Sequence, residues 1–122
     1  KSSQPKFVTL SSGLGSIALA SQLAIDSYAY SASKTAVNWI MCKLHHDFPD
    51  FVIFPISPGV VATDMAQTEP SDDPDYAAFQ KAYPAITPQE SARAILEQVN
   101  VATRETHGGK FVDYTGLGKW AW

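Results

Sequence analysis

The sequence has little cysteine, little arginine and no long apolar run, and each shortage excludes a class of protein. A single cysteine, Cys42, excludes an internal disulfide framework and a multi-cysteine zinc site, and no metal is expected. Two arginines and a net charge of −3 offer no basic surface to a nucleic acid. The longest uncharged run, residues 7–25, is too rich in serine and glycine for a membrane-spanning helix. We therefore expect a cytoplasmic protein without membrane or nucleic-acid partners.

The residues that are present have the composition of one globular domain. Hydrophobic residues make up 45% of the 122 positions and charged residues 17%, which is not the composition of a disordered chain. This length suits one compact domain and is too short for two. The chain begins with Lys1 rather than methionine, so a processed chain or a fragment is expected.

The apolar patterning predicts strands and helices in alternation. Three short runs rich in β-formers predict strands, and two stretches with apolar residues at helical spacing predict the main helices. The strands are expected over residues 6–11, 51–56 and 110–114, and the helices over residues 28–48 and 88–102. Pro55 falls inside the second strand although proline removes a ladder donor. The alternation indicates an α/β fold with a parallel sheet.

Two connecting segments carry weaker signals. Residues 12–27 have no clear period and predict a long loop with one helical turn. Residues 64–86 begin with an acidic loop and continue into a short helix, which Asp73 and Pro74 would open. Aromatic residues at positions 76, 79 and 83 would form a stripe on that helix, either as a cover over a substrate or as simple packing.

The strongest chemical motif is Tyr30-Ser31-Ala32-Ser33-Lys34. Tyr30 and Lys34 lie four positions apart, so on a helix they share one face. An ammonium group close to a phenol favours the phenolate, which makes a phenol useful as a proton donor or acceptor near neutral pH. The spacing alone also fits a packed tyrosine beside a solvated lysine.

Two further motifs surround this pair and strengthen the chemical interpretation. Ser12 directly follows the predicted strand at residues 6–11 and lies eighteen residues before Tyr30. The next predicted strand ends in Pro58-Gly59, and Thr63 follows four residues later. Since α/β sheets bind ligands at the carboxyl ends of their strands, these groups are expected at one edge of the sheet.

The chain resembles the C-terminal half of the short-chain dehydrogenase/reductase family. The resemblance rests on the order of three motifs, which are the serine, the Tyr-x-x-x-Lys run and the Pro-Gly with its threonine. The resemblance covers nearly the whole chain, and the nearest subgroup looks like fungal norsolorinic acid ketoreductases. It implies part of a Rossmann-like doubly wound parallel sheet, with residues 1–122 as a single partial domain. The nucleotide-binding half should then precede Lys1, and residues 64–86 should form the substrate-loop region.

The resemblance also implies an activity, which is reduction of a ketone or aldehyde to an alcohol, or the reverse, with NADP or NAD as cofactor. NADP is slightly favoured by the subgroup. Tyr30 would donate a proton to the substrate oxygen, Ser12 would hydrogen-bond the same oxygen, and Lys34 would support Tyr30 and bind the nicotinamide ribose. The implied cofactor-binding residues are Tyr30, Lys34, Pro58, Gly59, Val61 and Thr63. The partner is a small carbonyl or alcohol substrate, and a homo-oligomer is compatible with the family.

Three alternatives remain open on the sequence. The spacing from Ser12 to Tyr30 is several residues longer than is usual in the family, so Ser11 or Ser16 could replace Ser12. Residues 13–18 match a G-x-G-x-x-A dinucleotide turn, but the pattern lacks the second strand that such a turn needs. Finally, the chain could be a catalytically silent fragment that acts as a binding or association module through an exposed strand edge.

Overall fold

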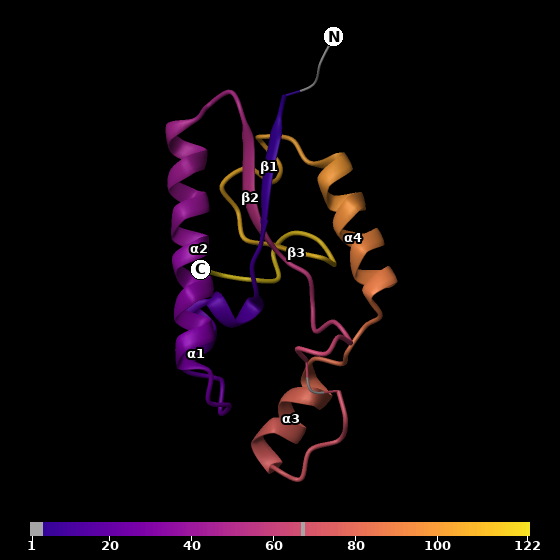
Figure 1. The fold of residues 1–122 in the computed structure, drawn as a ribbon. Coiled ribbons are helices and arrows are strands. Elements are labelled where there is room, and N and C mark those ends of the chain that lie inside the picture. Colours follow the sequence, from indigo (N-terminus) through magenta and orange to yellow (C-terminus); the bar gives the residue numbers. More distant parts are fainter. Residues whose placement is uncertain (1–3, 67) are drawn as a thin grey trace.

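Residues 4–66 and 68–122, which the computed structural model describes, form a three-stranded parallel sheet covered by helices on both faces (Figure 1). The strand order is β1-β2-β3, with β1 at Lys6–Leu10, β2 at Val52–Ser57 and β3 at Val112–Asp113. This arrangement confirms the α/β class and the parallel sheet. Residues 1–3 and 67, which belong to the expected domain and substrate-loop region, lie outside the described residues.

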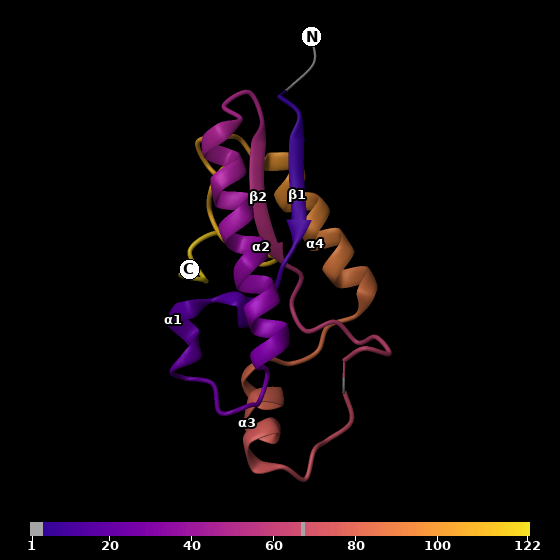
Figure 2. The same ribbon diagram turned by 60° about the vertical axis from the view of Figure 1, so that its left-hand side comes forward.

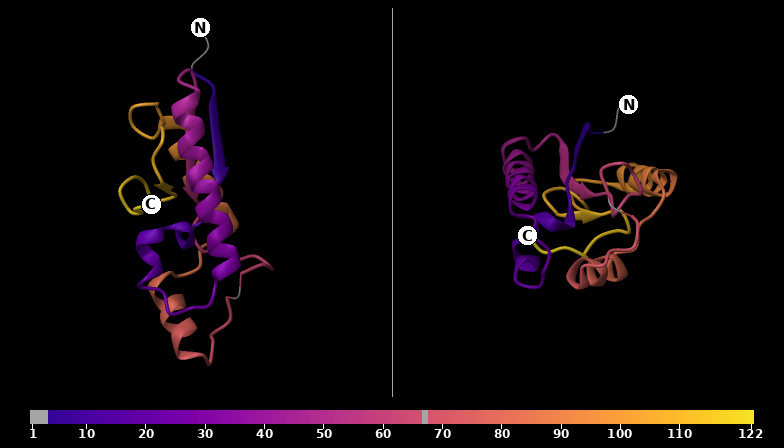
Figure 3. Two further views of the ribbon diagram at one scale, coloured as in Figure 1. Left: turned by 90° about the vertical axis from the view of Figure 1, so that its left-hand side faces the viewer. Right: turned by 60° about the horizontal axis from the view of Figure 1, so that its bottom comes forward.

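The two long helices lie on opposite faces of the sheet, as the end-on view in Figure 3 shows. Helix α2 (Tyr28–Asp47) connects β1 to β2, and helix α4 (Pro88–Val101) precedes β3. The shorter α3 (Pro74–Ala82) lies beyond the carboxyl ends of the strands (Figure 2). No helix within the described ranges is both long and apolar enough to cross a membrane.

Strand β2 is central because all six of its residues are buried between the two helical layers. On the α4 side, Phe54 and Ile56 form the core together with Val112. Helix α2 covers the other face of the sheet (Figure 3), and its Met41 is buried. Burial on both faces explains why the sequence of this strand is a continuous apolar run rather than an alternating one.

Pro55 is tolerated in this central strand because the pairing of β2 with β3 begins one residue later. The register pairs Ile56 with Val112 and Ser57 with Asp113. The missing N–H of Pro55 therefore falls before the start of that ladder. The predicted strand is confirmed, and its proline lies where β2 has no β3 partner.

Helix ends are capped largely as the sequence predicts. The Asp73 carboxylate accepts backbone N–H groups at the start of α3, and the Thr87 hydroxyl accepts the Glu90 N–H at 3.1 Å at the start of α4. At the end of α2, the Arg104 guanidinium donates to the carbonyl groups of His45, Phe48 and Phe51. These bonds pair donors and acceptors that would otherwise have no partner inside a helix.

Two segments differ from the sequence-based expectation. Residues 12–27 contain two short turns rather than one, η1 (Gly13–Gly15) and α1 (Ile17–Ala20). The last strand is shorter than the expected residues 110–114, because the chain turns back immediately after Asp113. The Asp113 carboxylate accepts the Thr115 N–H at 3.1 Å, and its backbone N–H donates to the Gly116 carbonyl at 3.0 Å. An aspartate that binds the backbone two residues ahead favours a turn over a continued strand.

Candidate active site

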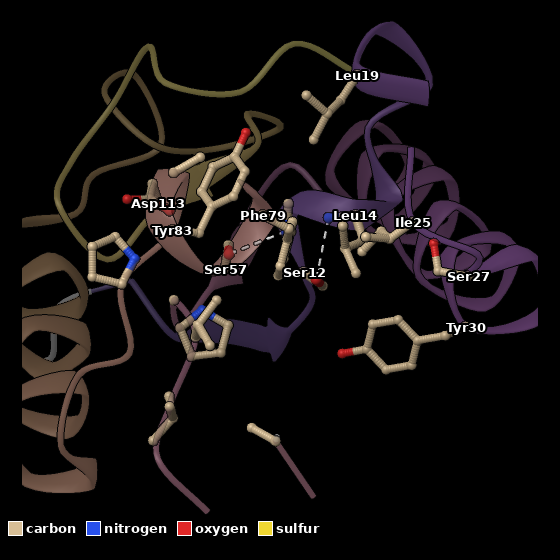
Figure 4. Close-up of a pocket in the computed structure, with 18 of the residues that line it drawn as sticks. Ser12, Leu14, Leu19, Ile25, Ser27, Tyr30, Ser57, Phe79, Tyr83 and Asp113 are labelled. Carbon is tan, nitrogen blue, oxygen red and sulfur yellow. Dashed lines mark hydrogen bonds between the residues drawn. The ribbon is translucent and has the colours of Figure 1, made fainter. Parts of the chain in front are cut away.

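A cavity of about 580 Å³ lies at the carboxyl ends of the strands (Figure 4), and residues of α3 form part of its wall. Three polar residues that end or follow the strands lie on its wall, namely Ser12 after β1, Ser57 at the end of β2 and Asp113 at the end of β3. A parallel sheet brings the carboxyl ends of its strands to one edge, so residues distant in the sequence meet there.

Tyr30 enters this cavity from the first turn of α2. Figure 4 shows its ring reaching from the helix toward the open centre, with the hydroxyl at the leading end. The Lys34 ammonium lies 5.7 Å from the centroid of the Tyr30 ring and donates to the Leu10 carbonyl at 3.2 Å. Tyr30 and Lys34 therefore share one helix face as predicted, with Lys34 at the end of β1 and outside the cavity wall.

The structure distinguishes the three candidate serines. Of these, Ser12 lines the cavity, where its hydroxyl oxygen accepts the Leu14 N–H at 3.2 Å. The buried Ser11 donates to the Oδ1 atom of Asn38 at 2.6 Å, on the side of α2. Ser16 caps α1 and donates to the Ala121 carbonyl at 2.6 Å. Ser12 is thus the one of the three that shares the cavity with Tyr30.

The expected cofactor residues after β2 also lie on the cavity wall, namely Pro58, Gly59, Val61 and Thr63. Gly59 has a φ of +83°, and a Cβ atom there would lie 2.6 Å from the Tyr114 ring. Both the conformation and the space therefore require glycine. The Pro58 carbonyl accepts the Ser91 hydroxyl of α4 at 2.7 Å, which fixes this loop to the sheet's covering layer.

The two glycines of the G-x-G-x-x-A match serve packing. A Cβ atom on Gly13 would lie 2.4 Å from the Trp120 ring, and one on Gly15 would lie 2.8 Å from the Lys34 backbone. The segment forms a 3-10 turn and a one-turn helix, and the next strand is β2, after α2. It therefore lacks the strand-turn-helix-strand context of a dinucleotide turn.

The fully buried Asp113 is a polar residue of the cavity wall that sequence reasoning missed. Its Oδ1 atom accepts the indole N–H of Trp120 at 2.8 Å, and its Oδ2 atom accepts the Thr115 hydroxyl and lies 3.6 Å from the Lys119 ammonium. The available signal was an acidic residue directly after the apolar pair Phe111-Val112, at a predicted strand. Its partners could not be inferred, because they belong to an irregular segment without a period.

Aromatic rings form the part of the cavity wall that faces the strand ends. Tyr76, Phe79 and Tyr83 of the α3 segment all line the cavity, as does Trp120. The Phe79 and Tyr83 ring centroids are 5.0 Å apart, and those of Tyr83 and Trp120 are 6.1 Å apart. The predicted stripe therefore both packs on itself and covers the cavity.

Comparison with known proteins identifies relatives by sequence, although no family model matches the chain. The short-chain dehydrogenase/reductase AacuF of Aspergillus aculeatus is 34% identical over 94% of this chain and 48% of that protein. The short chain dehydrogenase gsfK of Penicillium aethiopicum is 39% identical over 91% of this chain and 43% of that protein. A norsolorinic acid ketoreductase of Aspergillus parasiticus is 31% identical over 77% of this chain and 32% of that protein.

Solved structures of similar fold include two carbonyl reductases. The carbonyl reductase Sniffer of D. melanogaster superimposes with a TM-score of 0.70 and 28% identity over 96% of this chain and 41% of that chain. An NADPH-bound carbonyl reductase from chicken fatty liver has the same fold, with a TM-score of 0.75 and 23% identity over 96% of this chain and 42% of that chain. The chain thus spans somewhat under half the length of the proteins it matches. By sequence and by fold, it belongs to the short-chain dehydrogenase/reductase family.

Proposed function

We propose that this chain is the catalytic part of an NAD(P)-dependent oxidoreductase that reduces a ketone or aldehyde to an alcohol, or runs the reverse reaction. The observation that carries the proposal is that Ser12 and Tyr30 line one cavity at the strand ends, with Lys34 one helical turn behind Tyr30. Two hydroxyl groups and a nearby cation suit a reaction in which a carbonyl oxygen gains charge and then a proton. The names of the relatives, a short-chain dehydrogenase/reductase and a short chain dehydrogenase, support the same class.

In the proposed mechanism, Tyr30 donates its hydroxyl proton to the substrate oxygen during reduction. Ser12 donates a hydrogen bond to the same oxygen and stabilises the negative charge that develops on it. Lys34 stabilises the phenolate that Tyr30 becomes, because its ammonium is held near the ring by the Leu10 carbonyl. The segment 64–86, which contains α3, forms the substrate loop over a small carbonyl or alcohol substrate.

The wall after β2 fits the nicotinamide end of the cofactor, which would supply or accept the hydride. Gly59 presents bare backbone to the cavity because its left-handed φ and the Tyr114 ring exclude a side chain. Pro58, Val61 and Thr63 line the same cavity, as does Tyr30 of α2. A preference for NADP over NAD is proposed from the likeness to the norsolorinic acid ketoreductase group.

The experiment that tests this function compares Tyr30→Phe with Tyr28→Phe. Both remove one phenol oxygen from the first turn of α2, but Tyr28 is 88% exposed and does not line the cavity. In an assay of NADPH oxidation with a ketone, Tyr30→Phe is expected to lower kcat by about 100- to 10,000-fold, and Tyr28→Phe to leave it unchanged. Full turnover by Tyr30→Phe would overturn the assignment.

A second candidate function is a catalytically silent association module. Among the described residues, β1 pairs with β2 on one side and has no strand on the other, and Phe7 and Leu10 are about half exposed. An open edge with apolar side chains favours pairing with another chain or with a second copy. Titration with NADPH separates the two candidates, since tight binding of the nucleotide by this chain counts against a silent module.

A further inference from the structure

We propose that Trp120 is a specificity-determining residue of this cavity, and that it holds a flat aromatic substituent of the substrate against Tyr83 and Phe79. This inference rests on the proposed function, because it assigns a substrate class to the same site. The segment that carries it, residues 114–122, contributes no group to the proposed proton transfer. Tyr114, Lys119 and Trp120 nevertheless line the cavity.

Trp120 is held in place on several sides. Its indole N–H donates to the fully buried Asp113 carboxylate at 2.8 Å. Its ring stacks on the buried Phe111, with centroids 6.2 Å apart, and the Lys119 ammonium lies 5.1 Å from its centroid. A ring with a fixed hydrogen bond loses little conformational freedom when a ligand packs on it. The Trp120 ring is therefore preorganised for a ligand, and its segment is held against the rest of the fold.

The position of the ring places it next to the reacting groups. The six-membered ring of Trp120 packs on Gly13, where a Cβ atom would lie 2.4 Å away. Gly13 directly follows Ser12, and its N–H donates to the Ser57 hydroxyl at 3.2 Å. A substituent that contacts Trp120 is therefore attached close to the carbonyl group that Ser12 would bind.

The neighbouring rings favour a flat aromatic group over a saturated one of the same skeleton. Phe79 and Tyr83 lie on the cavity wall beside Trp120, with planes inclined by 44° to one another and, for Tyr83 and Trp120, by 32°. Inclined rings can offer both faces and edges to a further ring, and aromatic pairs prefer such offset or tilted geometries. A saturated ring gains only the burial of its area, whereas an aromatic ring also gains the interaction with these π systems.

The test uses tetralone and decalone, two bicyclic ketones that share a carbon skeleton and differ in one aromatic ring. Dissociation constants are measured by ligand-observed NMR on the chain without nucleotide, so that no turnover is needed. The wild-type chain is expected to bind tetralone about two- to tenfold more tightly than decalone. Because decalone is the more hydrophobic of the two, simple burial would favour decalone instead.

Three variants show which residue carries the preference. Trp120→Leu is expected to abolish the ratio, and Trp120→Phe, which keeps a ring, to retain most of it. The matched control is Trp39→Leu, since Trp39 is 67% exposed on α2 and does not line the cavity. If Trp120→Leu does not fold, as judged by circular dichroism, Tyr83→Leu takes its place with the same expected loss.

These outcomes test the inference and the proposed function independently of each other. A wild-type chain that binds decalone as tightly as tetralone, or that binds neither ketone, overturns the inference. A ratio that survives in folded Trp120→Leu and Tyr83→Leu overturns it as well. A ratio that follows the variants supports the inference even when no NADPH is oxidised, which would count against the proposed function alone.

Discussion

The two walls of the cavity are built in different ways. One, the hydroxyl wall, consists of Ser12 and Tyr30 and comes from the end of β1 and the first turn of α2. The other, the aromatic wall, consists of Phe79, Tyr83 and Trp120 and comes from α3 and the irregular segment after β3. The residues of the first lie in or beside a strand and a helix, whereas Trp120 of the second is positioned by side-chain contacts. The proposed chemistry thus lies beside regular elements, and part of the proposed recognition lies on an irregular segment.

The largest effect expected after that of Tyr30→Phe tests whether Ser12 also takes part in the chemistry. Ser12→Ala is expected to lower kcat by about 100- to 1000-fold, because it removes a donor to the developing negative charge. Its stability should change little, since the Ser12 hydroxyl makes one bond within its own turn, to the Leu14 N–H. Steady-state kinetics and thermal melting measure the two effects on the same protein.

The neighbouring serine is the control for this prediction. Ser11→Ala leaves the buried Oδ1 atom of Asn38 without its hydroxyl donor, so the free energy of unfolding should fall by about 1–3 kcal/mol. Its kcat should stay near the wild-type value, because Ser11 does not line the cavity. The reverse pattern, a slow Ser11→Ala and an active Ser12→Ala, would exchange the roles of the two serines.

The next largest effect is expected in the aromatic wall. Asp113→Ala removes the acceptor of the Trp120 indole and of the Thr115 N–H, and the half-buried indole N–H left unpaired costs about 1–3 kcal/mol of stability. The tetralone preference should fall together with the melting temperature. Asp113→Asn keeps an acceptor and should lose less of both. An Asp113→Ala chain with wild-type stability would show that the C-terminal segment is not held by this carboxylate.

The sequence predicts the hydroxyl wall well because its residues lie in or beside regular elements. The period of residues 28–48 identifies a helix, and the spacing of Tyr30 and Lys34 then determines that they share a face. The apolar runs around residues 6–11 and 51–56 identify strands, whose carboxyl ends must meet at one edge of the sheet. What the sequence left open there, the choice among three serines, depends on side-chain direction in a turn.

The aromatic wall could be predicted only in part. The stripe at positions 76, 79 and 83 follows from helical spacing, but the choice between cover and packing does not. Trp120 lies in an irregular segment, and its place depends on a hydrogen bond to Asp113 and on the absence of a Cβ atom at Gly13. The contact with Gly13 joins residues 107 positions apart in the chain, and no local pattern encodes it.

A smaller effect is expected where the two walls meet, at Gly13. Gly13→Ala places a methyl group 2.4 Å from the Trp120 ring, and overpacking of this kind costs about 1–3 kcal/mol. Since Gly13 is not among the glycines with positive φ, the cost is steric rather than conformational. The double variant Gly13→Ala with Trp120→Phe should recover part of the loss, because the ring that clashes becomes smaller. Additive losses in thermal melts would show that the two residues do not touch.

The smallest expected effect is a pH dependence of stability that comes from two histidines outside the cavity. His107 is 4% exposed beside Phe54, and burial lowers its pKa, as do Lys110 and Lys6 to a lesser extent. The pKa of His45 is lowered by burial and then by Arg104 and His46. Neither histidine lines the cavity.

A histidine whose pKa is lower in the folded state binds fewer protons there than in the unfolded chain, where its pKa is about 6.5. The free energy of unfolding should therefore be fully maintained above pH of about 6.5 and decrease as the pH falls below it. Thermal melts across this range measure the decrease, and His107→Asn should reduce its slope. The ratio of tetralone to decalone affinity should stay constant over the same range, because neither histidine lines the cavity. If the preference for tetralone instead falls together with stability, protonation of the histidines affects the aromatic wall.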